Sequence, residues 1–451
     1  MKTVLLIGTL DTKGAEYQFV RERLQAEGIR PLMMDVSMRE LRSAYSPDIS
    51  SAEVARAAGM DIASLAKLER VPALKAMTQG AIQLAEELFR RGKFQAAMAL
   101  GGSNGTAIAC AVMQRFPFVV PKLMVSTMAS GDVRAYVGCK DILMLFPVGD
   151  ISLNRLTKRI LGNAVGAMAG MLKAKPIEEG KRRIQIALTV FGVVQPCAER
   201  AKALLEEKGF EVVVFHTSGT GGMALEEWVS HGEIDAVLDL STTELADEVV
   251  GGVLSAGPHR LEAAGARGIP QVVIPGAIDL VNFQSPETVP EKWKDRVFYR
   301  HTPHITLMRT NVAESGALGV LLAKKLNRAV GPAKVLIPLR GFSAYDSPEG
   351  PRAMNLQGGP ASRPWFWPEA DQEFHRAVRE NLNRARVGYE ELPLHINEPA
   401  FAERAVQALE DMIGKTVFPK DLHPNEPYQL DSPGDHGGCR ISGRESTIRP
   451  R

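Results

Sequence analysis

Residues 4–36, VLLIGTLDTKGAEYQFVRERLQAEGIRPLMMDV, contain a complete strand–helix–strand pattern. An apolar run is followed by an amphipathic stretch that stops at Gly28, and a second apolar run begins near residue 30. Further apolar runs, FQAAMALGG, PKLMVSTM and DILMLFP, continue the rhythm. Apolar strands that alternate with amphipathic helices are typical of a parallel sheet covered by helices on both faces. The sequence therefore predicts an α/β fold.

The pattern then restarts in the second part of the chain. Residues 185–217, QIALTVFGVVQPCAERAKALLEEKGFEVVVFHT, align with residues 4–36 without a gap, and Gly209 falls opposite Gly28. Three more pairs follow in the same order: 94–106 with 234–246, 116–132 with 267–283, and 150–156 with 304–310. Four matches in one order predict two related α/β halves in tandem.

These matches set the predicted domain boundaries. We expect an N-terminal domain at residues 1–180 and a C-terminal domain at 181–417, whose sheet is completed by the strand and helix patterns after residue 333. Residues 418–451 are polar, rich in Pro and Gly, and aperiodic, so we predict a disordered tail there.

Composition excludes several classes of protein. The chain of 451 residues is 45% hydrophobic and 24% charged, with a formal net charge of +2, which favours neither a nucleic acid nor an anionic membrane as a partner. No apolar stretch approaches the ~20 residues of a membrane span, and no signal peptide is evident at the start. The four cysteines are scattered, without metal-binding spacing, which favours the cytoplasm.

In the first half, three predicted strands end in polar loops, at residues 8–14, 101–106 and 125–132. The strongest is Gly101–Thr106, GGSNGT, where a strand passes directly into a helix and free backbone amides can approach an anion. It is neither a Walker loop nor a dinucleotide fingerprint. If the first strand lies beside it, Lys13 can meet phosphate charge and Asp11 can hold Mg²⁺ or a ribose hydroxyl. The alternative is a set of solvated turns in which Ser, Asn, Asp or Thr caps a helix.

The matching loops of the second half lack this charge, but other polar residues take their place. Asp279, Asn282, His301 and His304 are candidate catalytic or metal-binding residues, because carboxylates and imidazoles move protons near neutral pH. The alternative is that the histidines cap or pack at helix starts. The glycines of FHTSGTGG, residues 215–222, fit either a phosphate site or a flexible turn.

Six motifs together, GTLDTKGAE, GGSNGT, STMASGD, FGVVQPC, PGAIDLVNF and HTPHITLMRTN, resemble the ATP-binding domain family of the tomato mosaic virus resistance protein and its bacterial relatives. The resemblance runs from Met1 to about Lys415. It implies two tandem Rossmann-like domains, ATP with Mg²⁺ in the N-terminal one, and a homodimer. Carried over by motif, the nucleotide site comprises Thr9, Asp11, Thr12, Lys13, Gly101, Gly102, Ser103, Asn104, Gly105, Thr106, Ser126, Thr127, Ser130 and Gly131, with Asp11 as the metal ligand.

Two hypotheses on function follow. The first is an ATP-binding protein whose second domain carries an unassigned activity on a small metabolite, including an ATP-dependent one. The second is a nucleotide-responsive module that binds another protein without catalysis. A sugar-nucleotide transferase is a third class, suggested only by the analogy of two Rossmann-like halves. Steady ATP turnover would favour an enzyme, and tight retention without turnover would favour the module.

Overall fold

The computed structural model describes residues 1–39, 45–175 and 183–416. These ranges form two compact units: the first comprises the described residues up to 175 except 138–140, and the second comprises residues 138–140 and 183–416. The predicted tail at 418–451 lies outside the described residues, as does the expected boundary near residue 180.

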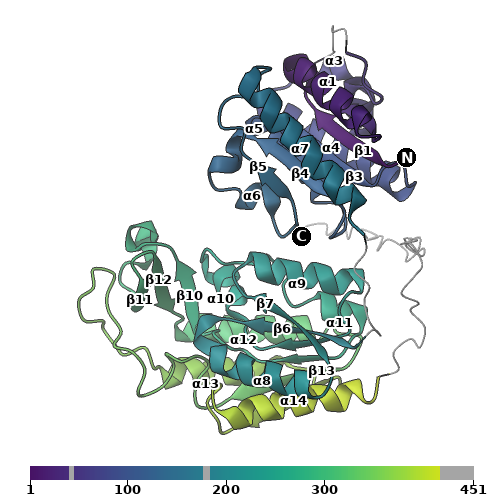
Figure 1. Cartoon of the computed structure of the whole chain (residues 1–451). Coiled ribbons are helices and arrows are strands. Elements are labelled where there is room, and N and C mark those ends of the chain that lie inside the picture. Colours follow the sequence, from purple (N-terminus) through teal and green to yellow (C-terminus); the bar gives the residue numbers. More distant parts are fainter. Residues whose placement is uncertain (40–44, 176–182, 417–451) are drawn as a thin grey trace, which may run out of the picture. The chain divides into compact units, whose positions relative to one another are not determined.

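The first unit is a five-stranded parallel sheet in the order β2-β1-β3-β4-β5 (Figure 1). Its strands are β1 (Thr3–Gly8), β2 (Arg30–Asp35), β3 (Ala96–Gly101), β4 (Lys122–Ser126) and β5 (Leu143–Leu145). Its helices are α1 (Leu10–Ala26), α2 (Ser51–Ala57), α3 (Ile62–Leu65), α4 (Arg70–Arg90), α5 (Ser103–Met113), α6 (Arg134–Val137) and α7 (Arg155–Lys173). One core joins the sheet to α1 and α7, and the other joins it to α2, α4 and α5.

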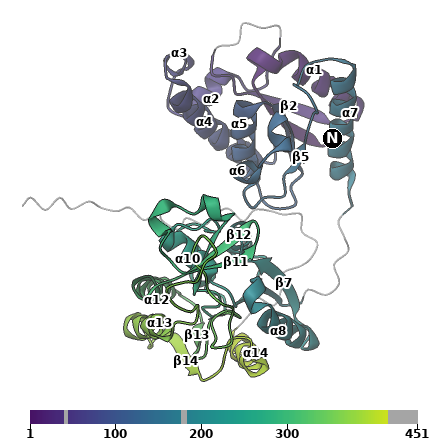
Figure 2. The same ribbon diagram turned by 90° about the vertical axis from the view of Figure 1, so that its left-hand side faces the viewer.

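The second unit is built around a six-stranded parallel sheet in the order β14-β13-β9-β8-β6-β7. Its strands are β6 (Gln185–Val190), β7 (Glu211–His216), β8 (Ala236–Asp239), β9 (Gln271–Val273), β13 (Ala333–Pro338) and β14 (Val387–Leu392). Its helices are α8 (Gln195–Glu207), α9 (Thr220–His231), α10 (Thr243–Val250), α11 (Ala263–Arg267), α12 (Val312–Leu326), α13 (Pro368–Asn381) and α14 (Pro399–Ile413). Figure 2 shows α8 and α14 on one face of this sheet and α12 and α13 on the other.

The expected α/β fold with two sheets covered on both faces is therefore confirmed. The two sheets share one strand order, since β7-β6-β8-β9 repeats β2-β1-β3-β4. The ungapped alignment also holds in the backbone. Lys13 interrupts α1 with φ −127° and ψ 21°, and the aligned Val194, which precedes α8, has φ −122° and ψ 14°. Gly28 and Gly209 both have positive φ, 72° and 86°, where the helix turns toward the next strand.

One of the four sequence matches is wrong. Residues 305–309 form β12 (Ile305–Arg309), whereas residues 150–156 are the loop before α7 and that helix's first residues. Strand β12 belongs to a separate antiparallel sheet, in the order β10-β12-β11, with β10 (Leu280–Phe283) and β11 (Phe298–Thr302). The alternative that the two histidines start a helix also fails, because His301 lies in β11 and His304 in the turn that follows it.

None of the helices in the described ranges combines the length and the hydrophobicity needed to cross a membrane.

Candidate functional site

The strand order of the first unit reverses between β1 and β3, because β2 lies outside β1 and β4 lies outside β3. In doubly wound sheets, ligands bind beyond the carboxyl ends of the strands at this reversal. The loops that begin at Thr9 and at Gly101 follow these two strands, and the loop at Ser126 follows the neighbouring β4. The structure thus brings the three predicted loops to one edge of one sheet.

Tyr17 closes the gap between β1 and β3 at the reversal. The ladder between these strands ends at the pair Ile7 and Ala99. Beyond it, the buried Tyr17 hydroxyl lies 2.8 Å from both the amide and the carbonyl of Leu100, and it also contacts the carbonyl of Ile7. A Cβ on Gly8 would lie 2.0 Å from the ring of Tyr17, so glycine is required there. Burial raises the pKa of Tyr17, so the hydroxyl remains protonated.

The glycine loop is open at its second residue. Gly102 is the N-cap of α5 with φ −83°, and no side chain caps that helix. A Cβ built on Gly102 would meet only Thr127 Oγ1, at 3.8 Å. Thr106 and Ser126, by contrast, are fully buried and hydrogen-bonded to each other at 2.7 Å, and Thr106 also donates to the Gly102 carbonyl. These two hydroxyls hold the loops together.

Two backbone amides of the loop after β1 are already hydrogen-bonded to side chains of the protein. The amide of Leu10 donates to Asp35 Oδ1 and that of Asp11 to Ser37 Oγ, both at 3.2 Å. The Thr9 and Thr12 hydroxyls share a 3.1 Å hydrogen bond, and Thr12 and Asp11 are exposed.

Lys13 points to the loop that precedes α7. Its ammonium lies 3.5 Å from the carboxylate of Asp150 and donates to the carbonyl of Ile151. The Lys13 side chain is 19% exposed and Asp150 is 77% exposed, so solvent screens the pair. No group of three or more His, Cys, Asp or Glu side chains arranged to bind a metal occurs in the described ranges. The predicted metal ligand Asp11 is an exposed carboxylate.

Sequence reasoning missed an arginine at this edge. Arg70, the first residue of α4, donates to Asn104 Oδ1 at 3.1 Å and is otherwise exposed. Ser103, Ser130 and Gly131 are exposed on the same loops. Arg70 lies 31 residues before the glycine loop, so only the packing of α4 beside α5 brings it there.

In the second unit, Asp279 is the most constrained of the predicted residues. It is 1% exposed, and its Oδ2 accepts hydrogen bonds from Ser343 Oγ at 2.8 Å and from the indole of Trp365 at 2.9 Å. Its Oδ1 is buried and has no hydrogen-bond partner among the described residues. Burial, together with the negative charge of Asp346, raises the pKa of Asp279 to about 6.

The other three predicted residues are not brought together with Asp279 as one constellation. His301 is exposed, and its Nδ1 lies 2.7 Å from the hydroxyl of Tyr345, whose ring packs on Trp365. Asn282 is buried and donates to Asp247 Oδ2 at 2.7 Å. His304 is exposed, and its backbone amide donates to the Thr302 hydroxyl. Only His301 is linked to Asp279, through two aromatic side chains.

The glycine turn after β7 already holds an anion, which is the carboxylate of Glu244. Glu244 Oε1 accepts from the amides of Gly219 and Gly222 at 2.7 and 3.0 Å. Glu244 also pairs with the buried Arg260, which reaches Asp239 as well. Because a Cβ on Gly222 would lie 2.1 Å from Glu244 Oε2, this turn has no room for a phosphate.

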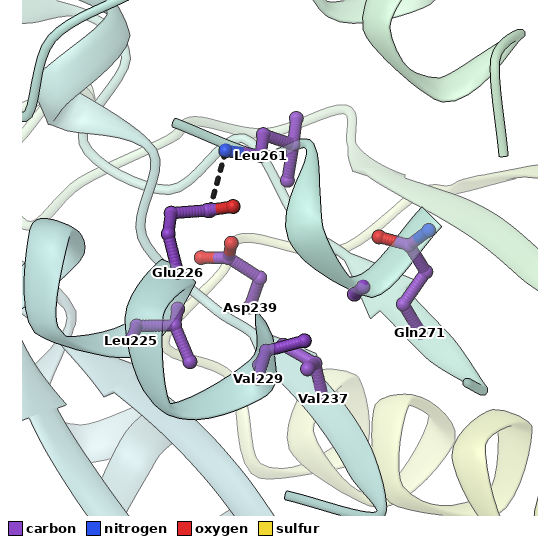
Figure 3. Close-up of a pocket in the computed structure, with 8 residues that line it drawn as sticks. Leu225, Glu226, Val229, Val237, Asp239, Leu261 and Gln271 are labelled. Atoms are coloured by element: carbon purple, nitrogen blue, oxygen red, sulfur yellow. Dashed lines mark hydrogen bonds between the residues drawn. The ribbon is translucent and has the colours of Figure 1, made fainter. Parts of the chain in front are cut away.

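Beside this network lies a small hollow, shown in Figure 3. Apolar side chains of α9 and β8 line it, together with Asp239, Gln271 and Glu226. Glu226 accepts from the amides of Leu261, Glu262 and Ala263 at 2.6–3.1 Å, so it caps the start of α11. The two carboxylates at this hollow, Glu226 and Asp239, are therefore already hydrogen-bonded within the fold.

Comparison with known proteins decides the family. The model of the N-terminal domain of the uncharacterised protein family UPF0261 matches residues 2–176, and that of its C-terminal domain matches residues 183–413. The chain belongs to the UPF0261 family. A UPF0261 protein of Clostridium tetani is 41% identical over 92% of this chain and 100% of its own length. The tomato protein ToMV resistance protein Tm-1(GCR237) is 32% identical over 93% of this chain and 56% of its own length.

The family assignment confirms the resemblance seen in the six motifs. Among solved structures, a UDP-N-acetylglucosamine 2-epimerase from Rickettsia bellii overlaps 60% of this UPF0261 chain and 78% of its own, with 11% identity and a TM-score of 0.21. That overlap is too small to bear on function.

Proposed function

We propose that this UPF0261 protein binds ATP with Mg²⁺ at the carboxyl edge of the first sheet, and that its second unit acts on a small molecule. The observation that carries the proposal is the uncovered backbone at Gly102. Neither its φ of −83° nor any neighbour requires glycine there, since a Cβ would meet only an ordinary contact. A phosphate that approaches the backbone amides at the start of α5 does require it.

Charge around the loop supports a phosphate ligand. Lys13 and Arg70 are the cations, and both have partners, Asp150 and Asn104, that a phosphate can replace. Mg²⁺ in nucleotide sites is commonly held by one or two carboxylates, with phosphate oxygens and water as the other ligands. The exposed Asp11 fits the carboxylate role. Tyr17 fills the gap between β1 and β3, so the nucleotide would lie above the strand ends.

The alternative function is a nucleotide-responsive module that binds another protein. The name of the tomato relative, a resistance protein, favours it, because resistance to a virus is compatible with binding rather than catalysis. Steady phosphate release from ATP, alone or with a metabolite extract, supports the enzyme. Retention of ATP without release supports the module. We also propose a homodimer, as the family resemblance implies, and a cytoplasmic location, as the scattered cysteines favour; sedimentation of the full chain tests the dimer.

The direct test is calorimetric titration of Mg·ATP into Gly102→Val. Valine places branched carbon where phosphate should lie, and the open space predicts that the variant still folds. We expect ATP binding to be lost while the melting temperature stays within a few degrees of the wild type.

Gly192→Val is the matched control, because Gly192 follows β6 in the second sheet and a Cβ there meets nothing within 4 Å. It should bind ATP normally. Unchanged affinity in Gly102→Val would show that the glycine loop is only a turn.

A further inference from the structure

A buried charge cluster surrounds Asp279 in the second unit. Arg309, on β12, is 1% exposed and donates to Asp371 Oδ1 at 2.5 Å and to Asp346 Oδ1 at 3.3 Å. It also donates to the backbone carbonyls of Asp279 and Trp365. One guanidinium therefore holds the loops after β9 and β13 together with the start of α13.

The cluster contains more negative than positive charge. Among the residues that the structure describes, three carboxyl groups, those of Asp279, Asp346 and Asp371, surround the guanidinium of Arg309. Burial raises the pKa of all three, and for Asp279 and Asp346 the value is about 6. Near neutral pH, uncompensated negative charge thus remains in a desolvated site, which is costly unless a cation or a proton neutralises it.

Among the described residues, Asp279 Oδ1 is one of eight buried side-chain atoms without a hydrogen-bond partner, and it is the carboxylate oxygen of this cluster in that group. The other two oxygens of Asp279 have partners: Oδ2 accepts from Ser343 and Trp365, and the backbone carbonyl accepts from Arg309 and from the amide of Thr310. Buried polar atoms are rarely left unpaired in native proteins. The unpaired oxygen therefore indicates a hydrogen-bond donor that is not part of this chain.

Aromatic side chains lead outward from Asp279. Tyr345 packs edge-on against Trp365 with ring centroids 5.9 Å apart, and Tyr299 lies 4.7 Å from Tyr345. Both tyrosines are partly exposed, and the Tyr345 hydroxyl meets the exposed His301. Carboxylates flanked by aromatic rings attract ammonium groups through charge and through cation–π contact.

We propose that the second unit binds a small molecule bearing a primary ammonium group, with Asp279 Oδ1 as the acceptor and with the aromatic rings of Tyr345 and Tyr299, which continue outward from Trp365, on the approach to it. The proposal rests on the small-molecule role of the second unit and requires no nucleotide. An ammonium supplies both the missing donor and the missing positive charge. A neutral polyol supplies only the first, and an anion is repelled.

The test is thermal unfolding of the full chain with methylammonium, ethanolamine or putrescine chloride at pH 7.5. Controls are NaCl at equal ionic strength and the neutral ethylene glycol. We expect the amines, and not the controls, to raise the transition of the second unit by about 3 °C or more. The shift should shrink below pH 6, where a proton on Asp279 replaces the ammonium.

Asp279→Asn keeps the side-chain size and should abolish the amine shift. Asp247→Asn is the matched control, because Asp247 is also buried with its pKa raised, but both of its oxygens have partners. It should retain the shift. If no amine acts more strongly than NaCl, or if Asp279→Asn responds like the wild type, the proposal is wrong.

An equal response to ethylene glycol would also overturn it, by indicating a neutral ligand or a bound water. Titration of Mg·ATP into the same variants separates the two proposals. A variant that loses the amine response but binds ATP normally tests only the amine site of the second unit. A variant that loses ATP binding but keeps the amine response tests only the nucleotide site of the first unit.

Discussion

Removing the hydroxyl of Tyr17 should destabilise the first unit more than any exposed substitution does. At the end of the β1–β3 ladder, this hydroxyl serves the amide and carbonyl of Leu100 and the carbonyl of Ile7. One hydroxyl donates one proton and accepts one, so Tyr17→Phe loses two hydrogen bonds. It also leaves buried backbone groups of Leu100 and Ile7 without a partner. At about 1–1.5 kcal/mol for each bond, the cost is about 2–3 kcal/mol, or about 4–12 °C in the melting temperature of a unit this size.

Two measurements on the full chain test this reasoning. Calorimetry gives the shift of the first unit's transition, and hydrogen–deuterium exchange of peptides spanning residues 96–106 shows whether the Leu100 amide loses protection. Tyr389→Phe is the control, because its hydroxyl is partly exposed and donates to the side chain of the nearby Glu391. A shift no larger than that of the control, with unchanged exchange at Leu100, would refute the role assigned to Tyr17.

Lys13→Ala should weaken ATP binding about tenfold or more, because a charged phosphate contact contributes ~1.5–3 kcal/mol. His304→Ala, an exposed change in the second unit, should leave ATP affinity unaltered, and equal losses in calorimetry would mean one composite site. For Asp279 and Asp346, pKa values raised from 3.8 to about 6 mean that the folded state keeps protons which the unfolded state releases, so their contribution to stability falls as pH rises from about 4 through 6. The second unit's transition should therefore drop more between pH 5 and 7.5 in the wild type than in Asp279→Asn, and an equal pH dependence in both would contradict the assignment.

The sequence predicts the repeated architecture well because that architecture follows from local periodicity. The alignment that pairs Lys13 with Val194 holds even in backbone angles, since the same turn from strand to helix occurs in both halves. The antiparallel sheet β10-β12-β11 was not predicted. Its strands have 4, 5 and 5 residues and interrupt the parallel rhythm, and runs that short do not distinguish a strand from a helix start.

The site is predicted less completely, because its chemistry depends on contacts between distant residues. Strand ends mark the loops at Gly101 and Ser126, and the glycine spacing predicts an anion-binding turn at the first of them. Nothing in the sequence distinguishes Arg260 or Arg309 from surface arginines, yet both are buried among carboxylates. The sequence gives no reason to prefer His301 over His304 as a site residue. The fold distinguishes them, because the hairpin of β11 and β12 places His301 against Tyr345.

The two halves differ at the residue whose carboxylate occupies the turn after β7. In the alignment of residues 94–106 with 234–246, Glu244 falls opposite Asn104. The same position therefore carries a neutral amide in the first half and a carboxylate in the second. In the first half, Asn104 Oδ1 accepts from Arg70, and the phosphate that we propose there would come from solution. In the second half, the carboxylate of Glu244 accepts from the amides of the turn after β7, with Arg260 as its counter-ion. The anion in that turn thus comes from the chain itself. The same strand order therefore carries an open glycine loop in one half and a turn occupied from within the chain in the other.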